Sequence, residues 1–393
     1  MTAAEPLIGV INAGSSSLKF GIYEGERQLL SGQVDGLGTR PSIATAGPDG
    51  TAISPPELGE PRPATPSEVL PVIFRWLRER LRPRRLAALG HRVVHGGIRH
   101  SRPARVNPQL LDELEALVPI APLHEPQNIA PIRMAMILDP DLPQVACFDT
   151  AFHRTMPEVG QIFGLPYALY EEGIRRYGFH GLSYEYIASV LPDSAPEIAD
   201  GKIVILHLGN GCSACALQER KSVATTMGFT ALEGLPMGTR CGALDPGVIL
   251  HFLQQKGMTP DSVADLLYRQ SGMLGLSGIS SDFRELLASD EPRAKFALNV
   301  FYYNAARQIA SLAGALGGLD AIVFTAGIGE NAAPVRSAIG NGCAWLGVAL
   351  DEAANRDHKE RISSSASRVA VFNFKTNENL IIARHTRALI VSP

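Results

Sequence analysis

Short apolar runs alternate with longer amphipathic stretches along this chain. Apolar runs bounded by turn residues predict strands, and apolar residues recurring every three or four positions predict helices. The strands are expected at 7–13, 17–23, 89–94, 144–148, 202–208, 213–217, 320–325 and 368–373. The helices are expected at 67–82, 108–116, 126–137, 184–191, 260–269 and 292–316. Residues 35–66, rich in Pro, Gly, Thr and Ala, predict an irregular connection with short strands. This alternation is typical of an α/β fold with mixed sheets flanked by helices.

Two distant segments repeat one pattern. "IGVINAGSSSLKFGIYE" begins at Ile8 and "IVILHLGNGCSACALQE" begins at Ile203, about half a chain later. Each is an apolar strand, a turn of small residues and an alternating strand, which suggests a duplicated fold, although glycine hairpins are common. Because 393 residues exceed the usual size of one core, we expect two domains. They are placed at 1–150 and 151–380, with 381–393 packing back onto the first.

Composition excludes several functional classes. The chain is 45% hydrophobic and 19% charged, and its net charge of −3 argues against a nucleic-acid or membrane binder. No signal peptide and no apolar run of membrane-spanning length is recognisable. Five sparse cysteines do not form a disulfide framework, so a cytoplasmic location is expected. Cys212 and Cys215 have zinc or redox spacing, but they lie in an alternating apolar stretch, which favours a structural role.

Three turns are built from glycine and small polar residues: 12–19, 207–211 and 324–331. Such turns either are plain tight turns or bring amides and hydroxyls together as a phosphate cradle. In the third, a strand and two glycines precede a predicted helix, with Glu330 and Asn331 near its first turn. A helix N-terminus there would face an anion or a nucleotide. The segment is neither a P-loop nor a G-x-G-x-x-G motif.

Charged residues stand beside these turns. Arg92 and Arg240 could be salt-bridge partners, or bidentate clamps for carboxylate or phosphate. Asp149 and Glu378 follow strands, where each could cap a helix or hold Mg²⁺. His180, between Phe and Gly, could be an ordinary hydrogen-bonding residue or a catalytic donor.

Several stretches, in this order, resemble the acetokinase family of the sugar kinase/actin/chaperone superfamily. They are "NAGSSSLKF", "GHRVVHGG", "APLHEP", "CFDTAFHRTMP", "YGFHG", "HLGNG", "LEGLPMGTRCG", "GISSDFREL", "FTAGIGEN" and "TNEN". The resemblance implies duplicated ribonuclease-H-like, actin-like ATPase domains with the active site in the interdomain cleft, usually in a homodimer. It also implies reversible, in-line phosphoryl transfer from ATP to acetate, giving acetyl phosphate and ADP, with Mg²⁺, or Mn²⁺ in its place, as cofactor. Propionate or another short-chain fatty acid is the alternative acceptor.

The resemblance also implies roles for individual residues. The catalytic residues would be Arg92, Asp149, His180 and Arg240. The acid would be bound by Arg92, Val94, Leu123 and Phe179. The metal would be held by Asn12 and Glu378, with Asp149 helping to organise it. The nucleotide would be bound by Ser15, Ser17, Lys19, His207, Leu208, Gly209, Asn210, Gly211, Asp282, Phe283, Arg284, Gly327, Ile328, Gly329, Glu330 and Asn331.

These residue types suit the reaction, because acetate is already ionised at neutral pH and needs no general base. The obstacle is repulsion between two anions, which Arg92, Arg240, the metal and a donor at His180 would offset. Val94 favours acetate, because propionate-preferring relatives tend to have a smaller residue there. Ala231 stands where the family has proline, and we expect it to widen the acyl pocket towards propionate.

Other departures from the family pattern leave Arg92, Asp149, His180, Arg240 and Glu378 in place, which argues against a decayed, regulatory relative. They are Glu125 for Asn, Leu182 for Thr, Tyr184 for His, Cys241 for Ser, Ala243 for Asp, Ala326 for Gly and Asn379 for Glu. An actin-like or chaperone-like module that drives assembly is the remaining alternative, and a chaperone would need a peptide-binding domain after its ATPase.

Overall fold

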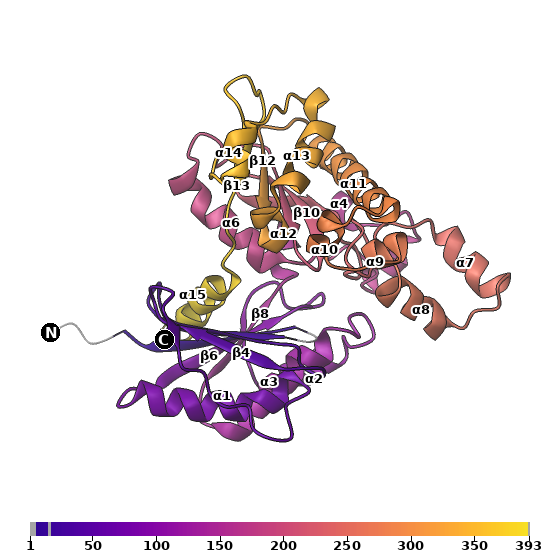
Figure 1. Ribbon diagram of the computed structural model, residues 1–393. Coiled ribbons are helices and arrows are strands. Elements are labelled where there is room, and N and C mark those ends of the chain that lie inside the picture. The colour runs from indigo at the N-terminus through magenta and orange to yellow at the C-terminus, as the bar shows by residue number, and fades with distance from the viewer. Residues whose placement is uncertain (1–4, 15–16, 392–393) are drawn as a thin grey trace. The chain divides into compact units, whose positions relative to one another are not determined.

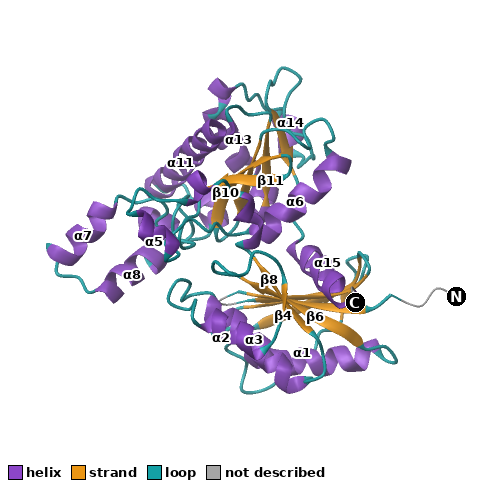
Figure 2. Cartoon of the chain, turned by 180° about the vertical axis from the view of Figure 1, so that it is seen from behind, coloured by secondary structure: helices purple, strands orange, loops and turns teal. Residues whose placement is uncertain are grey.

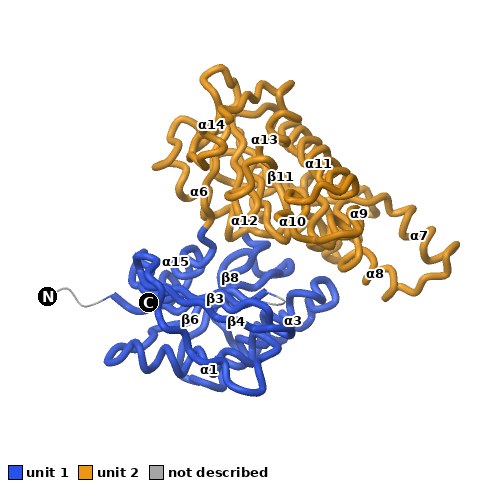
Figure 3. The backbone as a smooth tube through the Cα atoms, in the orientation of Figure 1, with its two compact units in different colours: residues 1–152, 377–393 blue, residues 153–376 orange. Residues whose placement is uncertain are grey.

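The computed structural model describes residues 5–14 and 17–391 of the chain. It forms two compact units (Figures 1 and 3), residues 1–152 together with 377–393, and residues 153–376. Each unit contains one mixed sheet with helices packed against it, which confirms the predicted α/β class. Within the described residues, no helix is both long enough and apolar enough to cross a membrane.

The first unit is organised around a sheet with the strand order β5-β4-β3-β2-β1-β6-β8-β7. Its strands are β1 (Leu7–Ala13), β2 (Leu18–Glu24), β3 (Arg27–Asp35), β4 (Ser42–Ala46), β5 (Ala52–Ile53), β6 (Leu86–Val93), β7 (Ala104–Arg105) and β8 (Gln144–Phe148). The central strand β1 is antiparallel to β2 and parallel to β6, which is in turn parallel to β8. The C-terminal ends of β1, β6 and β8 therefore lie at one edge of the sheet.

Helices cover both faces of this sheet. They are α1 (Pro66–Leu81), α2 (Pro108–Glu115), α3 (Glu125–Leu138) and α15 (Glu378–Val391). Figures 1 and 2 show α15 on the opposite face from α1 and α3, and it packs on β1 and β6. Helix α1 begins where Thr65 accepts a hydrogen bond from the Glu68 amide. Its apolar stripe, Leu70, Ile73 and Leu77 among others, is buried against the sheet.

The second unit has a sheet with the order β11-β10-β9-β12-β13. Its strands are β9 (Ile203–Leu208), β10 (Cys212–Gln218), β11 (Lys221–Thr225), β12 (Ala321–Thr325) and β13 (Ala370–Asn373). Its helices are α4 (Glu158–Gln161), α5 (Tyr167–Glu171), α6 (Gly181–Ser194), α7 (Pro246–Gln254), α8 (Pro260–Arg269), α9 (Gly272–Ser277), α10 (Phe283–Ala288), α11 (Pro292–Leu316), α12 (Ala326–Asn331), α13 (Ala333–Gly342) and α14 (Glu352–Arg356).

The two sheets share one core topology. In the second unit, β9 is antiparallel to β10 and parallel to β12, which is parallel to β13. The order β11-β10-β9-β12-β13 thus repeats β3-β2-β1-β6-β8 of the first unit, with the same relative strand directions. The segments that echo each other in the sequence are the first two strands of each sheet, so the duplication predicted from them is confirmed.

The structure has several elements that were not expected. They include strands β3, β7 and β11 and helices α4, α5, α7, α9, α10, α14 and α15, whereas β4 and β5 fall in the connection for which short strands were predicted. A helix, α12, begins at Ala326, directly after β12, so the expectation of a glycine loop followed by a helix start near Glu330 is wrong. Glu330 and Asn331 are instead the last residues of this short helix.

Candidate active site

Four polar residues gather at one edge of the first unit's sheet. Asn12 is near the end of β1, Arg92 near the end of β6, and Asp149 directly follows β8. Glu378 is the first residue of α15. The carboxyl ends of neighbouring parallel strands are where α/β folds form their sites. The topology therefore explains why residues up to 366 positions apart in sequence are in contact.

Arg92 and Asp149 form a buried ion pair. The Arg92 Nε lies 3.2 and 3.1 Å from the two carboxylate oxygens, and Nη2 lies 2.5 Å from Oδ2. Asp149 is completely buried, and the Arg92 side chain is 16% exposed. Burial alone would lower the pKa of Arg92, but the charges of Asp149 and Glu378 outweigh it and raise that pKa. The guanidinium is therefore permanently charged and fixed in orientation.

Asn12 connects this pair to Glu378. Its Nδ2 donates to Glu378 Oε2 at 2.8 Å, and its Oδ1 accepts a longer hydrogen bond of 3.4 Å from Arg92 Nη1. Two carboxylates and an amide oxygen are ligand types that Mg²⁺ accepts, with water and substrate phosphates completing its shell. No group of three or more His, Cys, Asp or Glu side chains that could hold a metal unaided occurs among residues 5–14 and 17–391. The residues present thus fit a metal held jointly with substrate.

The first glycine-rich turn joins β1 to β2. The Gly14 amide donates to the Ser17 carbonyl at 2.8 Å, which holds the adjoining ends of the two strands together. Lys19 is exposed and pairs with Asn12 in the register of the two strands, so both lie at the same level of the sheet. Ser15 lies outside the described residues.

The segment after β6 is held from α3. The Val94 amide donates to Asn128 Oδ1 at 2.9 Å, and Asn128 in turn donates to the Ala13 carbonyl at 3.0 Å. Val94 is buried and Leu123 is half-buried. Asn128 thus ties the β1 turn to the strand that carries Arg92, a role that its sequence position alone did not suggest.

Glu125 is a buried acid near the Arg92–Asp149 pair. Its Oε1 accepts the His95 amide at 2.7 Å, while its Oε2 has no hydrogen-bond partner within the described part of the chain. Burial is the main cause that raises the pKa of Glu125 to about 8, and the Asp149 carboxylate adds to it. The His95 amide and Arg92 act in the opposite direction. At neutral pH this carboxyl is therefore mostly protonated.

In the second unit, His180 is the N-cap of α6 and has a left-handed backbone conformation, with φ of 58°. Its Nδ1 lies 2.8 Å from the Ser213 hydroxyl, which lies 2.5 Å from the hydroxyl of buried Tyr184. The ring of His180 stacks on that of His207, with centroids 4.1 Å apart. Ser213 was not expected at this site, although the serine stands in the echoing strand β10.

His207 belongs to a parallel hydrogen-bond chain. Its Nδ1 lies 2.8 Å from the Ser183 hydroxyl, which lies 2.9 Å from the hydroxyl of Thr376. Phe179, which precedes His180, is buried, and its carbonyl lies 2.9 Å from His153 Nε2. The rings of His180 and His207 are thus both oriented by hydroxyls on their Nδ1 side.

Arg240 lies against the second glycine-rich turn. Its Nη1 donates to the Ala231 carbonyl at 2.6 Å. A Cβ added to Gly211 would lie 2.8 Å from Arg240 Nη2 and 3.1 Å from His180 Nε2. A side chain at position 211 would therefore displace the Arg240 guanidinium or the His180 ring from the turn. The structure thus brings Arg240, His180 and residues 207–211 together.

The segment 281–284 approaches the same turn through Gly238. A Cβ on Gly238 would lie 2.8 Å from Asn210 Oδ1 and 3.2 Å from the Ser281 carbonyl. Asp282 caps α10 and pairs with Arg284, and this pairing lowers the pKa of Asp282. Phe283 is buried in an edge-to-face contact with Phe301, 4.7 Å between centroids, so its side chain belongs to the core.

The third glycine-rich segment, α12, packs beside the second turn. An added Cβ at Gly329 would be 3.7 Å from the Leu208 Cβ. Glu330 Oε1 accepts the amides of Ala326 and Thr376 at 2.9 and 3.0 Å, and Asn331 donates to the Gly327 carbonyl. The side chains of Glu330 and Asn331 therefore stabilise α12 itself. An added Cβ at Gly327 would meet open space.

The cysteines of the "CSAC" segment are buried in β10. Burial raises the pKa of Cys212 and of Cys215 to about 12. Cys212 Sγ donates to the Gly209 carbonyl at the base of the second turn. Both thiols are therefore protonated at neutral pH and act as small packing groups.

Comparisons with known proteins all point to one family. The family model "Acetokinase family" matches residues 7–384. A protein of Nitrobacter hamburgensis named acetate kinase is 50% identical over 391 residues, covering 97% of this chain and 96% of its own. One of Rhizobium meliloti with the same name is 48% identical and covers 98% of both.

Solved structures give the same result. A propionate kinase from Francisella tularensis superposes with a TM-score of 0.89 at 35% identity, covering 98% of this chain and 99% of its own. Porphyromonas gingivalis acetate kinase superposes with a TM-score of 0.85 at 32% identity, covering 98% and 100%. The fold expected from the sequence is therefore confirmed.

Proposed function

Because this chain belongs to the acetokinase family, we propose that it transfers the terminal phosphoryl group of ATP to acetate, giving acetyl phosphate and ADP, reversibly. The observation that carries the proposal is the 50% identity, over nearly the full length, to a relative named acetate kinase. The strand-edge arginine and the glycine-lined turns described above supply groups of the kind that this chemistry needs.

The residues of the two units have separate tasks in this proposal. Arg92, fixed by Asp149, neutralises the carboxylate of the incoming acid. Arg240, fixed through the Ala231 carbonyl, and His180, oriented by Ser213, donate to the phosphoryl oxygens as charge spreads over them. The amides of residues 207–211 bind the phosphates of the nucleotide. The acid is ionised before it binds, so no residue has to remove a proton from it.

Magnesium is the metal that the donor set favours. Asn12, Asp149 and Glu378 would hold it, and it would neutralise the charge of the nucleotide phosphates. The hard oxygen donors also allow Mn²⁺.

Acetate is the preferred acceptor in this proposal. Val94 is buried and its amide is fixed by Asn128. In this proposal its side chain limits the space for the acyl group. The similarity to a propionate kinase structure and the small Ala231 support propionate as the second candidate.

An acceptor panel tests the proposal. Acyl phosphate formed from ATP is trapped with hydroxylamine, using acetate, propionate or butyrate, each with and without Mg²⁺. We expect metal-dependent product with the highest kcat/KM for acetate, and about 1–3 kcal/mol of discrimination per added methylene. ADP release that is independent of every acid would contradict a carboxylate acceptor, and a preference for propionate would select the second candidate.

We also propose a homodimer in the cytoplasm. Helix α7 has no buried residue although it is rich in apolar side chains, and Leu250 is 52% exposed. An apolar helix of this kind favours burial against a second copy of the chain. None of the five cysteines, all of which lie within the described residues, forms a disulfide, which suits a reducing compartment. Light scattering on the wild type and on Leu250→Glu tests the dimer, which this substitution should weaken.

A further inference from the structure

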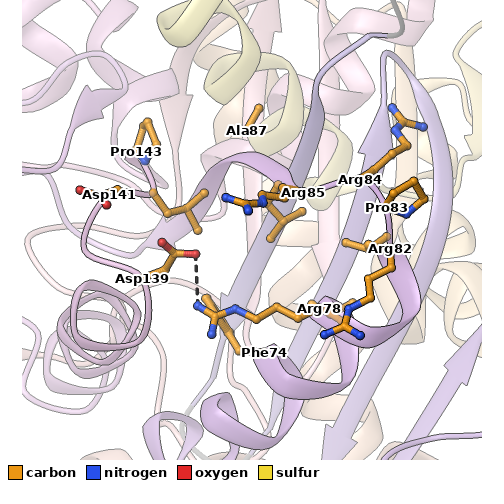
Figure 4. A pocket seen from close by; sticks show the side chains of 14 residues that line it. Phe74, Arg78, Arg82, Pro83, Arg84, Arg85, Ala87, Asp139, Asp141 and Pro143 are labelled. Carbon is orange, nitrogen blue, oxygen red and sulfur yellow. Dashed lines mark hydrogen bonds and ion pairs between the residues drawn. The ribbon is translucent and has the colours of Figure 1, made fainter.

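A cavity in the first unit lies away from the residues described above. It has a volume of about 700 Å³ and is formed by the C-terminal end of α1, residues 82–87, and the segment 139–143 between α3 and β8 (Figure 4). Leu86, the first residue of β6, lines it, whereas Arg92 stands near the other end of that strand. The cavity therefore lies at the N-terminal edge of the strand and is distinct from the candidate active site.

Four arginines line this cavity, and they are not equally neutralised. Arg78 donates to Asp139 at 3.2 Å and to the Leu138 carbonyl at 2.7 Å. Arg84 pairs with Glu24 at 2.8 Å. The side chains of Arg82 and Arg85, both exposed, make no hydrogen bond or ion pair with any residue that the structure describes, and Figure 4 shows both among the lining side chains. Asp141, also in the lining, is one opposing charge.

The remaining wall is apolar. Phe74 and Leu77 are 5% and 4% exposed, and both contribute to the wall as well as to the core of the unit. Leu81, Leu86 and Leu142 are half-buried beside them. The cavity thus combines cationic groups with an apolar surface, and its volume lies within the range of about 300–1,000 Å³ that is usual for small-molecule sites.

We propose that this cavity binds a small organic dianion, a phosphate monoester with an apolar substituent, held by Arg82 and Arg85. A guanidinium binds a phosphate through two parallel N–H groups, and two such groups without partners match a doubly charged head better than a single carboxylate. The substituent would cover the apolar wall of Phe74, Leu77 and Leu86. The chain carries a net charge of −3, so this concentration of arginine is a local feature and not the general character of its surface.

Phenyl phosphate is a suitable probe, because it unites the dianion with an apolar ring. Its binding is measured by isothermal titration calorimetry on the full chain. The test variant is Arg82→Ala/Arg85→Ala, and the matched control is Arg75→Ala/Arg80→Ala, which removes the same charge from exposed positions of α1 outside the cavity. Arg240→Ala serves as the control for binding at the candidate active site.

We expect saturable binding to the wild type, weakened about tenfold or more in Arg82→Ala/Arg85→Ala and unchanged in the two controls. Inorganic phosphate should bind more weakly than phenyl phosphate, because it cannot cover the apolar wall. Equal loss in the α1 control would show a general charge effect, and loss in Arg240→Ala would place the probe elsewhere. Either result, or no saturable binding to a folded wild type, overturns the proposal.

Discussion

The two units share one strand topology but place different chemistry at the equivalent edge of their sheets. In the first, a guanidinium and a carboxylate are buried together, and Glu378 and Glu125 lie near them. In the second, two stacked histidines are oriented by hydroxyl groups, and Arg240 donates to a carbonyl. Duplication therefore supplied the scaffold, while the residues after each strand were free to diverge. We call the edge with Arg92 and Asp149 the ionic edge. The free energy of unfolding should depend strongly on the charges there, and much less on the hydroxyl groups at the equivalent edge of the second unit.

Arg92→Ala should have the largest effect. It leaves Asp149 buried without its main partner, which costs about 3–5 kcal/mol in the free energy of unfolding. We also expect kcat to fall by about 10²-fold or more, because a charge donor is lost. Urea unfolding and steady-state kinetics measure the two effects. The double variant Arg92→Ala/Asp149→Ala should recover stability but not turnover, and a single variant as stable as wild type would contradict the ionic edge.

Arg240→Ala should lower turnover strongly while changing the free energy of unfolding little. Arg240 is half-buried, and its side chain donates to a backbone carbonyl, so we expect a stability change of about 1 kcal/mol. Turnover should still fall about 10²-fold. Arg240→Lys should restore little of it, because an ammonium cannot reproduce the planar fork. A variant that unfolds as readily as Arg92→Ala would remove the contrast between the units.

Glu125→Gln should change how stability depends on pH. The folded-state pKa of Glu125, about 8, exceeds its ordinary value of 4.5, so the folded chain retains a proton that the unfolded chain loses. Wild-type stability should therefore fall as pH rises from about 4.5 to about 8, and the uncharged amide of the variant should not contribute to that fall. At pH 8 we expect the variant to be more stable by roughly 2–4 kcal/mol, with little difference near pH 4.5. If the free energy of unfolding changes with pH in the same way in the wild type and the variant, the raised pKa of Glu125 is contradicted.

Ser213→Ala should lower turnover less than either arginine variant does. It removes the oxygen that lies between His180 and Tyr184, at a cost of about 1–3 kcal/mol, and it releases the imidazole. We expect about tenfold lower kcat with an unchanged Kd for ADP. Tyr184→Phe is the matched control, because it keeps the contact between Ser213 and His180. Weaker nucleotide binding by Ser213→Ala would instead show that Ser213 and His180 bind the nucleotide.

The strands that the sequence predicted well are those with continuous apolar runs, such as β1 and β9, which are buried along their whole length. Strand β3 was not predicted because it mixes polar residues with a glycine. Its pairing with β2, which the local sequence does not show, makes it a strand. Helix α12 was not predicted because it contains two glycines, which are typical of loops. It is held by Glu330 and starts at Ala326, whose φ is 65°, where the family pattern has glycine.

The candidate site was predictable as a set of residues but not as contacts. Arg92 and Asp149 are 57 positions apart, and only the parallel pairing of β6 with β8 brings them together. Glu125 was visible only as a departure from a family pattern, because its burial depends on how α3 meets the His95 segment. The hydroxyl partners of the two histidines come from α6 and β10, Thr376 after β13 contacts one of those hydroxyls, and no local spacing indicates these contacts.

Single-turnover formation of acetyl phosphate tests the central claim most directly. ATP, acetate and Mg²⁺ are mixed with excess enzyme, and the product is followed by ³¹P NMR of quenched samples for the wild type, Arg92→Lys and Arg240→Lys. The account predicts acetate-dependent product with the wild type and a rate lower by about 10²-fold in each folded variant. A wild type that hydrolyses ATP without forming acetyl phosphate, or a lysine variant with the wild-type rate, would contradict it.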